Sequence, residues 1–245
     1  DMYTLFSVLY AEFKLPFGIT YRISYHPSVA VTKEANYYST NTFTGRTSYT
    51  GGYGYRYHTN EFAWMFDNLI KWNRTFGVHN FDVTLLANAE QSKSFRSELN
   101  ASNFSPNERL TYHALQFGAN QILTSNDTQS SGDALMARLN YTLLDRYLLT
   151  ASIRRDGYSA FGQLNPRAVF PAFAFAWRIS EEPFYPQNDI LNRLKVRLSW
   201  GENGNRSIGI YSALAQMGSR RYYTGSAIQT GVYNTTLANP YLRWE

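Results

Sequence analysis

Residues 135–143 read Leu-Met-Ala-Arg-Leu-Asn-Tyr-Thr-Leu, and this short segment shows the pattern that decides the fold. Apolar side chains fall on every second residue from Leu135 to Leu143, while Arg138, Asn140 and Thr142 lie between them. Successive side chains of a β-strand point to opposite faces of its sheet. We therefore predict a strand here, with one apolar and one polar face.

The same alternation recurs along most of the chain. Further strand patterns occupy 19–26, 61–72, 80–90, 149–154, 172–179 and 194–200, and Tyr3 to Leu15 fits a first strand more loosely. In each strand we assign alternate residues to the two faces so that apolar and polar residues separate best. With this assignment the apolar faces carry no ionisable residue, and Asn68 is the lone polar residue among the apolar residues. The charges fall on the polar faces: Glu12, Lys14, Arg22, Glu61, Asp67, Lys71, Asp82, Glu90, Arg138, Arg154, Arg178, Lys195 and Arg197. The pattern predicts an all-β, antiparallel fold.

Strand length and aromatic placement favour a transmembrane β-barrel. Soluble strands average about five or six residues, whereas these run to roughly ten or more, the length that a tilted strand needs to cross a bilayer. Rings at strand ends on the apolar face can lie among lipid headgroups; they are Tyr3, Phe13, Trp72, Phe81, Tyr141, Tyr147, Trp177 and Trp200. The alternative is aromatic packing in the core of a soluble sandwich, which also alternates.

The links between strands alternate short and long. Links at 15–18, 74–77 and 144–146 are short and 181–192 is moderate, while 31–55, 95–131, 157–166 and the stretch after 201 are longer. Antiparallel strands place alternate links on opposite sides, and outer-membrane barrels have short periplasmic turns and long extracellular loops. Within one long loop, Ser105-Pro106-Asn107-Glu108 combines an N-cap, a first-turn Pro and a capping-box Glu, which predicts a short helix at 106–117.

Composition excludes several other classes. The 245 residues contain no cysteine, so disulfides and thiolate sites are absent, and a net charge of +5, scattered along the chain, gives no footprint for nucleic acid. No run of 18 apolar residues occurs and the mean hydropathy is −0.40, which excludes a transmembrane helix but not alternating barrel strands. The chain starts at Asp1 without a signal peptide, so we expect processed ends or a segment of a longer protein.

Catalytic and metal sites are not indicated by the residue pattern. Asp67, Asp82 and Glu90 could supply a carboxylate pair for glycoside hydrolysis, yet carboxylates that line a wet interior need no catalytic role. The four histidines lack metal-ligand spacing. We expect no catalytic residue, no metal and no cofactor.

Several strings resemble one known family. Residues 147–162 are similar to the stretch "YLLTASxRRDGSSRFG" of the SusC-like (SusC/RagA family) TonB-dependent outer-membrane receptors of Bacteroidetes. Residues 170–184, 194–205 and 239–245 resemble the later motifs "FPSxSxAWRISEEPF", "LKLRxSYGxxGN" and "NPxLKWE" in the same order, and 74–80 resembles the turn "KTFGKHN". The chain departs at Tyr158-Ser159-Ala160 and at Trp200, and the resemblance is weaker before Tyr57.

The resemblance implies a segment of a 22-stranded barrel in the bacterial outer membrane. Residues 1–245 would form a partial barrel domain of about eight or nine strands, without the plug, the TonB box and the remaining strands. The whole receptor would import oligosaccharides or peptides with a SusD-like surface lipoprotein and the TonB complex. Two other hypotheses are a stand-alone small barrel, such as a porin or adhesin, and a soluble carbohydrate-binding sandwich.

Candidate site residues fall into two groups. Tyrosines of the long loops could stack on sugar rings or pack on one another: Tyr37, Tyr38, Tyr49, Tyr53, Tyr55, Tyr57, Tyr222, Tyr223 and Tyr233. Arginines of the polar face would face the lumen and anchor the plug of the barrel through salt bridges: Arg138, Arg154, Arg178 and Arg197.

Overall fold

The computed structural model describes residues 1–47, 51–104, 109–186, 191–225 and 227–245. Strands dominate: β1 (Met2–Phe6), β2 (Leu9–Leu15), β3 (Ile19–Tyr38), β4 (Tyr53–Phe76), β5 (His79–Ser102), β6 (Asn120–Leu143), β7 (Tyr147–Tyr158), β8 (Arg167–Arg178), β9 (Lys195–Gly201), β10 (Gln216–Tyr223) and β11 (Ile228–Thr236). The helical elements are α1 (Phe43–Thr47) and the 3₁₀ turns η1 (Pro16–Gly18), η2 (Thr111–His113), η3 (Leu115–Phe117) and η4 (Ile179–Glu181). The predicted all-β class is confirmed.

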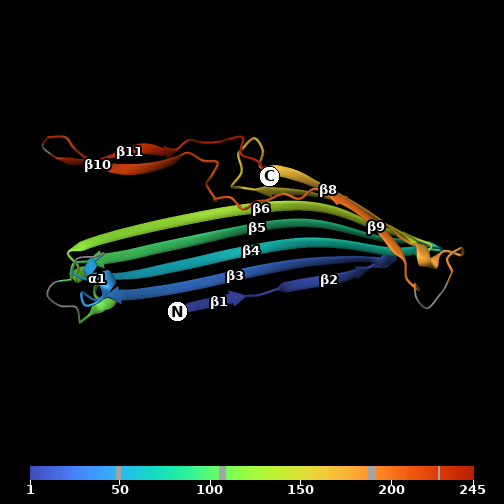
Figure 1. The fold of residues 1–245 in the computed structure, drawn as a ribbon, viewed down its shortest axis with the longest axis horizontal. Helices are drawn as coiled ribbons and strands as arrows, with labels where there is room; N and C mark the ends of the chain where they lie inside the picture. The colour runs from blue at the N-terminus through green and yellow to red at the C-terminus, as the bar shows by residue number, and fades with distance from the viewer. Residues whose placement is uncertain (48–50, 105–108, 187–190, 226) are drawn as a thin grey trace. The chain divides into compact units, whose positions relative to one another are not determined.

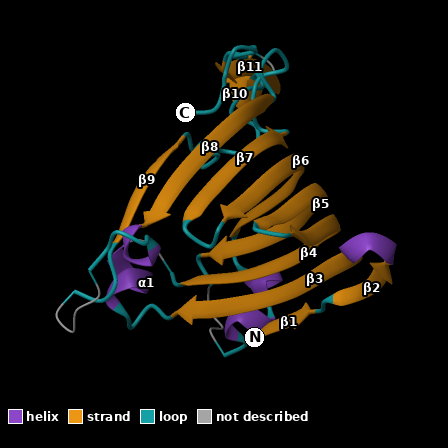
Figure 2. Ribbon diagram, turned by 90° about the vertical axis from the view of Figure 1, so that its right-hand side faces the viewer, coloured by secondary structure: helices purple, strands orange, loops and turns teal. Residues whose placement is uncertain are grey.

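Strands β1 to β9 form one sheet in which chain neighbours pair. The order is β3-β4-β5-β6-β7-β8-β9, and β1 and β2 both pair with β3. Figure 1 shows β3 to β6 side by side, and Figure 2 shows β7, β8 and β9 in the same succession. Among the described residues, β9 does not pair with β1 or β2. The sheet therefore has two edges and is not an eight-stranded closed barrel.

The pairing registers confirm the predicted faces. Arg138 lies opposite Ser152 in β7, and Ser152 lies opposite Ala172 in β8. Directly opposed residues of paired strands project on the same face, so the polar alternation of one strand continues across its neighbours. We call this the polar face and the other the apolar face.

The strands are longer than predicted. β3 continues to Tyr38, β4 begins at Tyr53, β5 runs to Ser102 and β6 begins at Asn120, so the loops predicted at 31–55 and 95–131 were too long. At 24 residues, β4 extends about 80 Å. Apolar alternation is required only where one face is hidden from water. Where both faces are wet, a strand can continue with polar residues and glycine, such as those at 124–133.

The loosely predicted first strand is interrupted. β1 and β2 keep one register along β3, from Met2 opposite Thr32 to Leu15 opposite Ile19, with a gap at Ser7 and Val8. Pro27 lies at this gap and has no N–H to donate to the ladder. Its carbonyl still accepts a hydrogen bond from the Ser7 N–H at 3.1 Å.

The helix predicted at 106–117 is not continuous. Residues 105–108 lie outside the described part of the chain, and the remainder forms the separate turns η2 and η3. Thr111 has φ 46° and Ala114 has φ −139° and ψ 64°, and neither conformation belongs to a helix. Within the described residues 109–117, the predicted helix is therefore replaced by two separate 3₁₀ turns.

The short links fall where the spacing predicted. The β4–β5 turn is Gly77-Val78, and Leu144-Asp145-Arg146 joins β6 to β7. Gly77 has φ 58°, and Leu144 and Asp145 both have φ 55°, which is uncommon for residues with a side chain. The Leu144 N–H donates to the Val78 carbonyl at 2.9 Å and thereby joins the two turns.

The chain divides into two compact units. The first comprises 1–8, 26–64 and 91–129; within it Ala101, Phe104 and Leu115 form a small covered cluster. The second comprises 9–25, 65–90 and 130–245 and includes the antiparallel hairpin β10–β11. Within the described ranges, no helix is long and apolar enough to span a bilayer.

Candidate functional site

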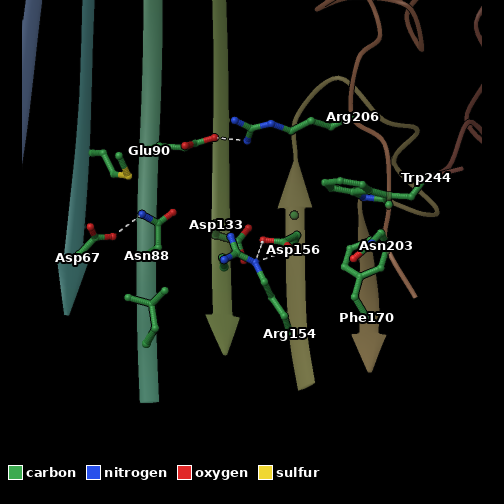
Figure 3. Close-up of a pocket in the computed structure, with 15 residues that line it drawn as sticks. Asp67, Asn88, Glu90, Asp133, Arg154, Asp156, Phe170, Asn203, Arg206 and Trp244 are labelled. Atoms are coloured by element: carbon green, nitrogen blue, oxygen red, sulfur yellow. Dashed lines mark hydrogen bonds and ion pairs between the residues drawn. The ribbon is translucent and has the colours of Figure 1, made fainter. Parts of the chain in front are cut away.

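The polar face of the second unit holds a pocket of about 610 Å³. Figure 3 shows side chains from β4, β5, β6, β7 and β8 together with residues that follow β9 and the last segment of the chain. The charged and aromatic lining residues are Asp67, Glu90, Arg154, Asp156, Phe170, Arg206 and Trp244; Asp133 also borders the pocket, although its strand position places it with Leu135 on the apolar face. Alternation brings Asp67, Glu90 and Arg154 to one face, as the sequence predicted.

The carboxylates of Asp67, Asp156 and Glu90 are each held by a neighbour. The Asn88 side-chain amide donates to Asp67 Oδ1 at 2.6 Å, and Arg154 Nε donates to both oxygens of Asp156 at 2.8 Å. Arg206 forms an ion pair with Glu90, which joins the segment after β9 to β5 (Figure 3). These carboxylates are structural partners and do not form the isolated pair that acid–base hydrolysis requires.

Asp82, the third carboxylate considered for catalysis, is likewise engaged. Its oxygens accept from the amides of Asn73 at 3.5 Å and Asn140 at 3.3 Å. Asn140 in turn accepts from the Thr150 hydroxyl at 3.0 Å. Asp82 therefore belongs to a polar network that crosses from β4 to β7.

An aromatic group closes one side of the pocket. Trp244 stacks on Phe161 with ring centroids 4.7 Å apart and meets Phe170 edge to face at 5.5 Å. A Cβ atom at Gly204 would lie 2.2 Å from the Phe170 ring, so only glycine fits there. The pocket thus offers flat apolar surface beside paired charges.

The last residues of the chain are held by main-chain hydrogen bonds. The N–H of Gly162 donates to the Leu242 carbonyl at 2.8 Å, and that of Asn205 donates to the Glu245 carbonyl at 2.8 Å. A Cβ atom at Gly162 would lie 2.1 Å from the Pro240 carbonyl oxygen. The motifs at 147–162, 194–205 and 239–245 therefore meet in space, which gives a physical reason for their co-occurrence.

The four predicted arginines have different surroundings. Arg154 lies in the pocket, and Arg178 donates to the Asp145 carbonyl at 3.1 Å in the β6–β7 turn. Arg138 and Arg197 are exposed, and neither makes an ion pair within the described ranges. Two of the four guanidinium groups are thus available to a further segment.

Several of the candidate tyrosines form a ladder in the first unit. Tyr38 stacks on Tyr53 with ring centroids 6.3 Å apart, and Tyr55 stacks on Tyr57 at 4.5 Å. The Arg96 guanidinium lies 4.9 Å from the centre of the Tyr57 ring. These residues lie in or beside strands and not in open loops, and their flat faces contact one another.

The other candidate tyrosines are dispersed. Tyr37 packs edge to face on Phe104 in the covered cluster, with ring centroids 5.3 Å apart. Tyr222, Tyr223 and Tyr233 lie on the β10–β11 hairpin, where Tyr223 is 70% exposed. Tyr49 lies outside the described residues.

Sequence reasoning missed five charged or aromatic members of the pocket: Asp133, Asp156, Phe170, Arg206 and Trp244. Phe170 and Asp156 continue the polar-face alternation of β8 and β7, so strand parity could have placed them. Arg206 and Trp244 lie in irregular segments, where no sequence periodicity predicts which way a side chain points. Only the fold reveals them.

An aromatic and polar cluster lies at the opposite end of β7 and β8 from the pocket. Glu182, just after η4, accepts hydrogen bonds from the Tyr147 hydroxyl at 2.7 Å, from Trp177 Nε1 at 2.9 Å and from Arg146 at 3.2 Å. The hydrogen bond from Tyr147, followed by that from Trp177, lowers the pKa of the Glu182 carboxyl. Glu182 and its three donors, Tyr147, Trp177 and Arg146, thus join the start of β7 to the end of β8. We call this group the clamp.

The aromatic residues predicted at this end form a band. Trp72 stacks on Phe81 with centroids 6.3 Å apart, Phe81 contacts Tyr141 at 5.0 Å, and Tyr147 stacks on Trp177 at 6.3 Å. Asn68, which the sequence pattern placed on the apolar face, also has a partner, since the Tyr21 hydroxyl donates to Asn68 Oδ1 at 2.6 Å. Within the part of the chain that the structure describes, no group of three or more His, Asp or Glu could hold a metal ion.

Comparison with known proteins decides the family. The family described as "TonB dependent receptor-like, beta-barrel" matches residues 4–245. The chain belongs to this receptor family. The receptor segment is 29% identical over 242 residues to TonB-dependent receptor P3 of Formosa agariphila, and the match covers 96% of the chain and 23% of that relative. It is 42% identical over 86 residues to TonB-dependent receptor SusC of Bacteroides thetaiotaomicron, covering 35% of the chain and 9% of SusC.

Solved structures agree on the fold. The RagAB peptide transporter superposes with a TM-score of 0.84 over 99% of the receptor segment and 27% of that chain, at 18% identity. The 'open-open' state of the RagAB peptide importer gives a TM-score of 0.76 at 20% identity, over 99% of the segment and 27% of that chain. The segment therefore spans about a quarter of these relatives. It is a SusC-like, non-enzymatic part of an outer-membrane β-barrel, as the motifs predicted.

Proposed function

We propose that the segment is a wall of an importer that takes up oligosaccharides or peptides across the outer membrane with a SusD-like lipoprotein and TonB. The main support is the two-faced sheet: an apolar face with aromatic rings at strand ends and a polar face that carries most of the charged side chains. In a barrel the first meets lipid and the second lines the lumen. RagAB is described as a peptide transporter, which makes a peptide cargo a concrete possibility for testing beside a glycan.

The open edges favour a large barrel over the stand-alone porin or adhesin. Unpaired N–H and C=O groups of an edge strand are costly in hydrocarbon, which is why membrane barrels close. In the described residues, β9 and the β1–β2 edge lack partners on their outer sides. We propose that further strands of the receptor pair with both edges.

The polar face has two proposed roles. Arg138 and Arg197, which are exposed and make no ion pair in the described ranges, are the candidates for salt bridges to the plug. The pocket that contains Arg206 and Trp244 is the candidate for cargo, because flat rings and fixed charges suit both sugars and peptides. Tyr38, Tyr53, Tyr55 and Tyr57 already stack on one another, so their proposed contact with cargo is through ring edges and hydroxyls.

The β10–β11 hairpin is the proposed contact for the lipoprotein. A two-stranded hairpin is marginal in water by itself, and this one exposes Met217, Tyr222, Tyr223 and Ile228 on its strands. It carries Arg220 and Arg221 and no acidic residue. An acidic, partly apolar surface on a partner would complement it.

The test uses the complete receptor gene in its native host. Deletion should abolish growth on one polymer class, either a glycan or a peptide mixture, and the tagged receptor should copurify a surface lipoprotein. The paired variant Arg220→Glu/Arg221→Glu should reduce copurification while the barrel remains folded. Normal growth of the deletion strain on every glycan and peptide supplied as sole nutrient would contradict the import proposal, and purification without a lipoprotein would contradict the partnership.

A further inference from the structure

The apolar face of the second unit contains a groove of about 520 Å³ that crosses β4 to β8. Its residues contrast in size: Ala87 and Ala137 lie between the larger side chains of Ile70, Leu85, Leu135, Ile153 and Val169. The larger ones are half exposed, with Ile153 at 53% and Leu135 at 48%. A small residue flanked by long ones leaves a dent in an otherwise regular apolar surface.

The rest of the receptor cannot fill this groove. It lies on inner strands of the sheet, with β3 beyond β4 on one side and β9 beyond β8 on the other. Further strands extend the sheet at its edges, and a plug fills the polar side. The apolar face of the barrel meets lipid, so lipid is the only medium that can occupy the dent.

A single cation lies at one end of the groove. Arg155 is directly opposite Leu135 in β6 and Val169 in β8, so its side chain is on the apolar face, whereas Arg154 is on the polar face. Arg155 lines the groove and makes no ion pair within the described ranges. An unpaired guanidinium beside apolar surface calls for an anionic ligand.

The nearest carboxylate on this face is already engaged. One step further along the strands, Asp133, Gly157 and Arg167 lie opposite one another. Arg167 binds Asp133 through both oxygens, at 2.9 and 3.1 Å. This bidentate pair occupies Asp133 and leaves Arg155 without an acidic partner.

The position of Arg155 across the membrane is close to that of the lipid headgroups. Tyr147 belongs to the aromatic band at the turn end, and Arg155 follows it by eight residues on β7. Eight residues extend about 26 Å along a strand, which becomes about 20 Å across the membrane at a tilt of 35–45°. Since the apolar band of such barrels is about 25 Å tall, Arg155 lies near its outer boundary.

We propose that this groove binds an acyl chain of a phosphorylated glycolipid of the outer leaflet, and that Arg155 donates hydrogen bonds to its phosphate. The planar guanidinium matches phosphate oxygens in pairs. The apolar groove would bind the acyl chain of the lipid, and the cation at its end would bind the phosphate. The inference rests on the membrane placement of the sheet and does not depend on which cargo is imported.

The experiment measures lipid retention by the complete receptor, purified in mild detergent, in native mass spectrometry with added lipid A that is either phosphorylated or dephosphorylated. Arg155→Gln removes the cation and retains a side chain of similar reach, and it should reduce retention of the phosphorylated lipid about ten-fold. Lys71→Gln is the control, since it removes a positive charge from the polar face of β4, next to Ile70 of the groove. It should leave retention unchanged.

Two further measurements complete the test. Dephosphorylated lipid should bind the wild-type receptor as weakly as phosphorylated lipid binds Arg155→Gln, and Ala137→Leu, which fills the groove, should reduce retention of both. Heat-modifiable migration on a gel shows that each variant is a folded barrel, and Arg155→Lys, which keeps the charge but loses the paired donors, should bind more weakly than wild type and more tightly than Arg155→Gln. Equal retention by Arg155→Gln and wild type, an equal loss in Lys71→Gln, or unchanged retention in folded Ala137→Leu would overturn the proposal.

Discussion

The hydroxyl of Tyr147 donates a 2.7 Å hydrogen bond to Glu182, which joins the first residue of β7 to the link that follows β8. The indole of Trp177 donates to the same carboxylate oxygen at 2.9 Å. One carboxylate therefore orients two rings of the aromatic band and fixes the end of a hairpin. Its removal should be felt by both strands.

Glu182→Gln should lower the thermal midpoint of the complete receptor by a few degrees, because the amide accepts more weakly and loses the ion pair with Arg146. Glu181→Gln is the matched control, as Glu181 is exposed and adjacent. Differential scanning calorimetry in detergent compares the two. Equal midpoints for both variants would show that the clamp is not stabilising.

The same carboxylate should make the clamp sensitive to acid. Because the pKa of Glu182 is lowered from the ordinary value of 4.5, its contribution to stability is complete above about pH 4.5 and is lost as the pH falls through the lower, folded-state pKa. Limited proteolysis of the link at 179–194 across an acid series measures this. Cleavage should rise in wild type below pH 4.5, whereas Glu182→Gln should show a flatter profile.

Tyr21 and Asn68 should contribute to the free energy of unfolding in a coupled way, because a hydrogen bond joins their side chains. Tyr21→Phe leaves the Asn68 carbonyl unsatisfied against lipid, at a cost of about 1–3 kcal/mol. The double variant Tyr21→Phe/Asn68→Leu removes both polar groups and should cost less than the sum of the single changes. Tyr25→Phe, on the same strand and face, is the control. Additive free energies of unfolding in the cycle would mean that the hydrogen bond contributes nothing.

A side chain at position 77 should destabilise the β4–β5 turn through backbone strain alone, without a steric clash. A Cβ atom there would meet nothing within 4 Å, yet φ is 58°. Gly77→Ala should therefore destabilise the β4–β5 turn by about 1 kcal/mol, and Gly77→Asn by less, because Asn tolerates this region. Denaturant titration of refolded receptor checks the order of the three proteins; an alanine variant as stable as wild type contradicts it.

The Arg206–Glu90 pair should hold the segment after β9 against β5. Arg206→Glu places two carboxylates together and should increase proteolytic cleavage within 202–214, and the exchange Glu90→Arg/Arg206→Glu should restore protection. Cleavage products are identified by mass spectrometry. If the exchange fails to restore protection while both single changes expose the segment, the contact is not a direct charge pair.

The presence of the strands, and the face on which each side chain lies, could be predicted from the sequence. This is because a strand with lipid on one side and water on the other needs apolar and polar residues in alternation. Asp67, Glu90 and Arg154 reached one pocket for this reason alone. Strand ends could not be read in the same way: beyond the bilayer both faces are wet, so the boundaries at Tyr38 and Ser102 carry no hydropathy signal.

Irregular segments were the other limit. Arg206 and Trp244 reach the pocket through main-chain hydrogen bonds among loops, which no residue pattern encodes. The helix was predicted from the capping signal Ser105-Pro106-Asn107-Glu108, which lies outside the described residues, and the backbone conformations at Thr111 and Ala114 are not helical. Local signals start an element, and packing decides how far it runs.

The short turns also set an order of assembly. Gly77-Val78 and Leu144-Asp145-Arg146 each join strands that are sequence neighbours, so closing either loop costs little chain entropy. Hairpins of this kind form in about 1–10 μs, far faster than pairing between distant strands. We expect the wall to grow two strands at a time, with each hairpin adding to the edge left by the one before it.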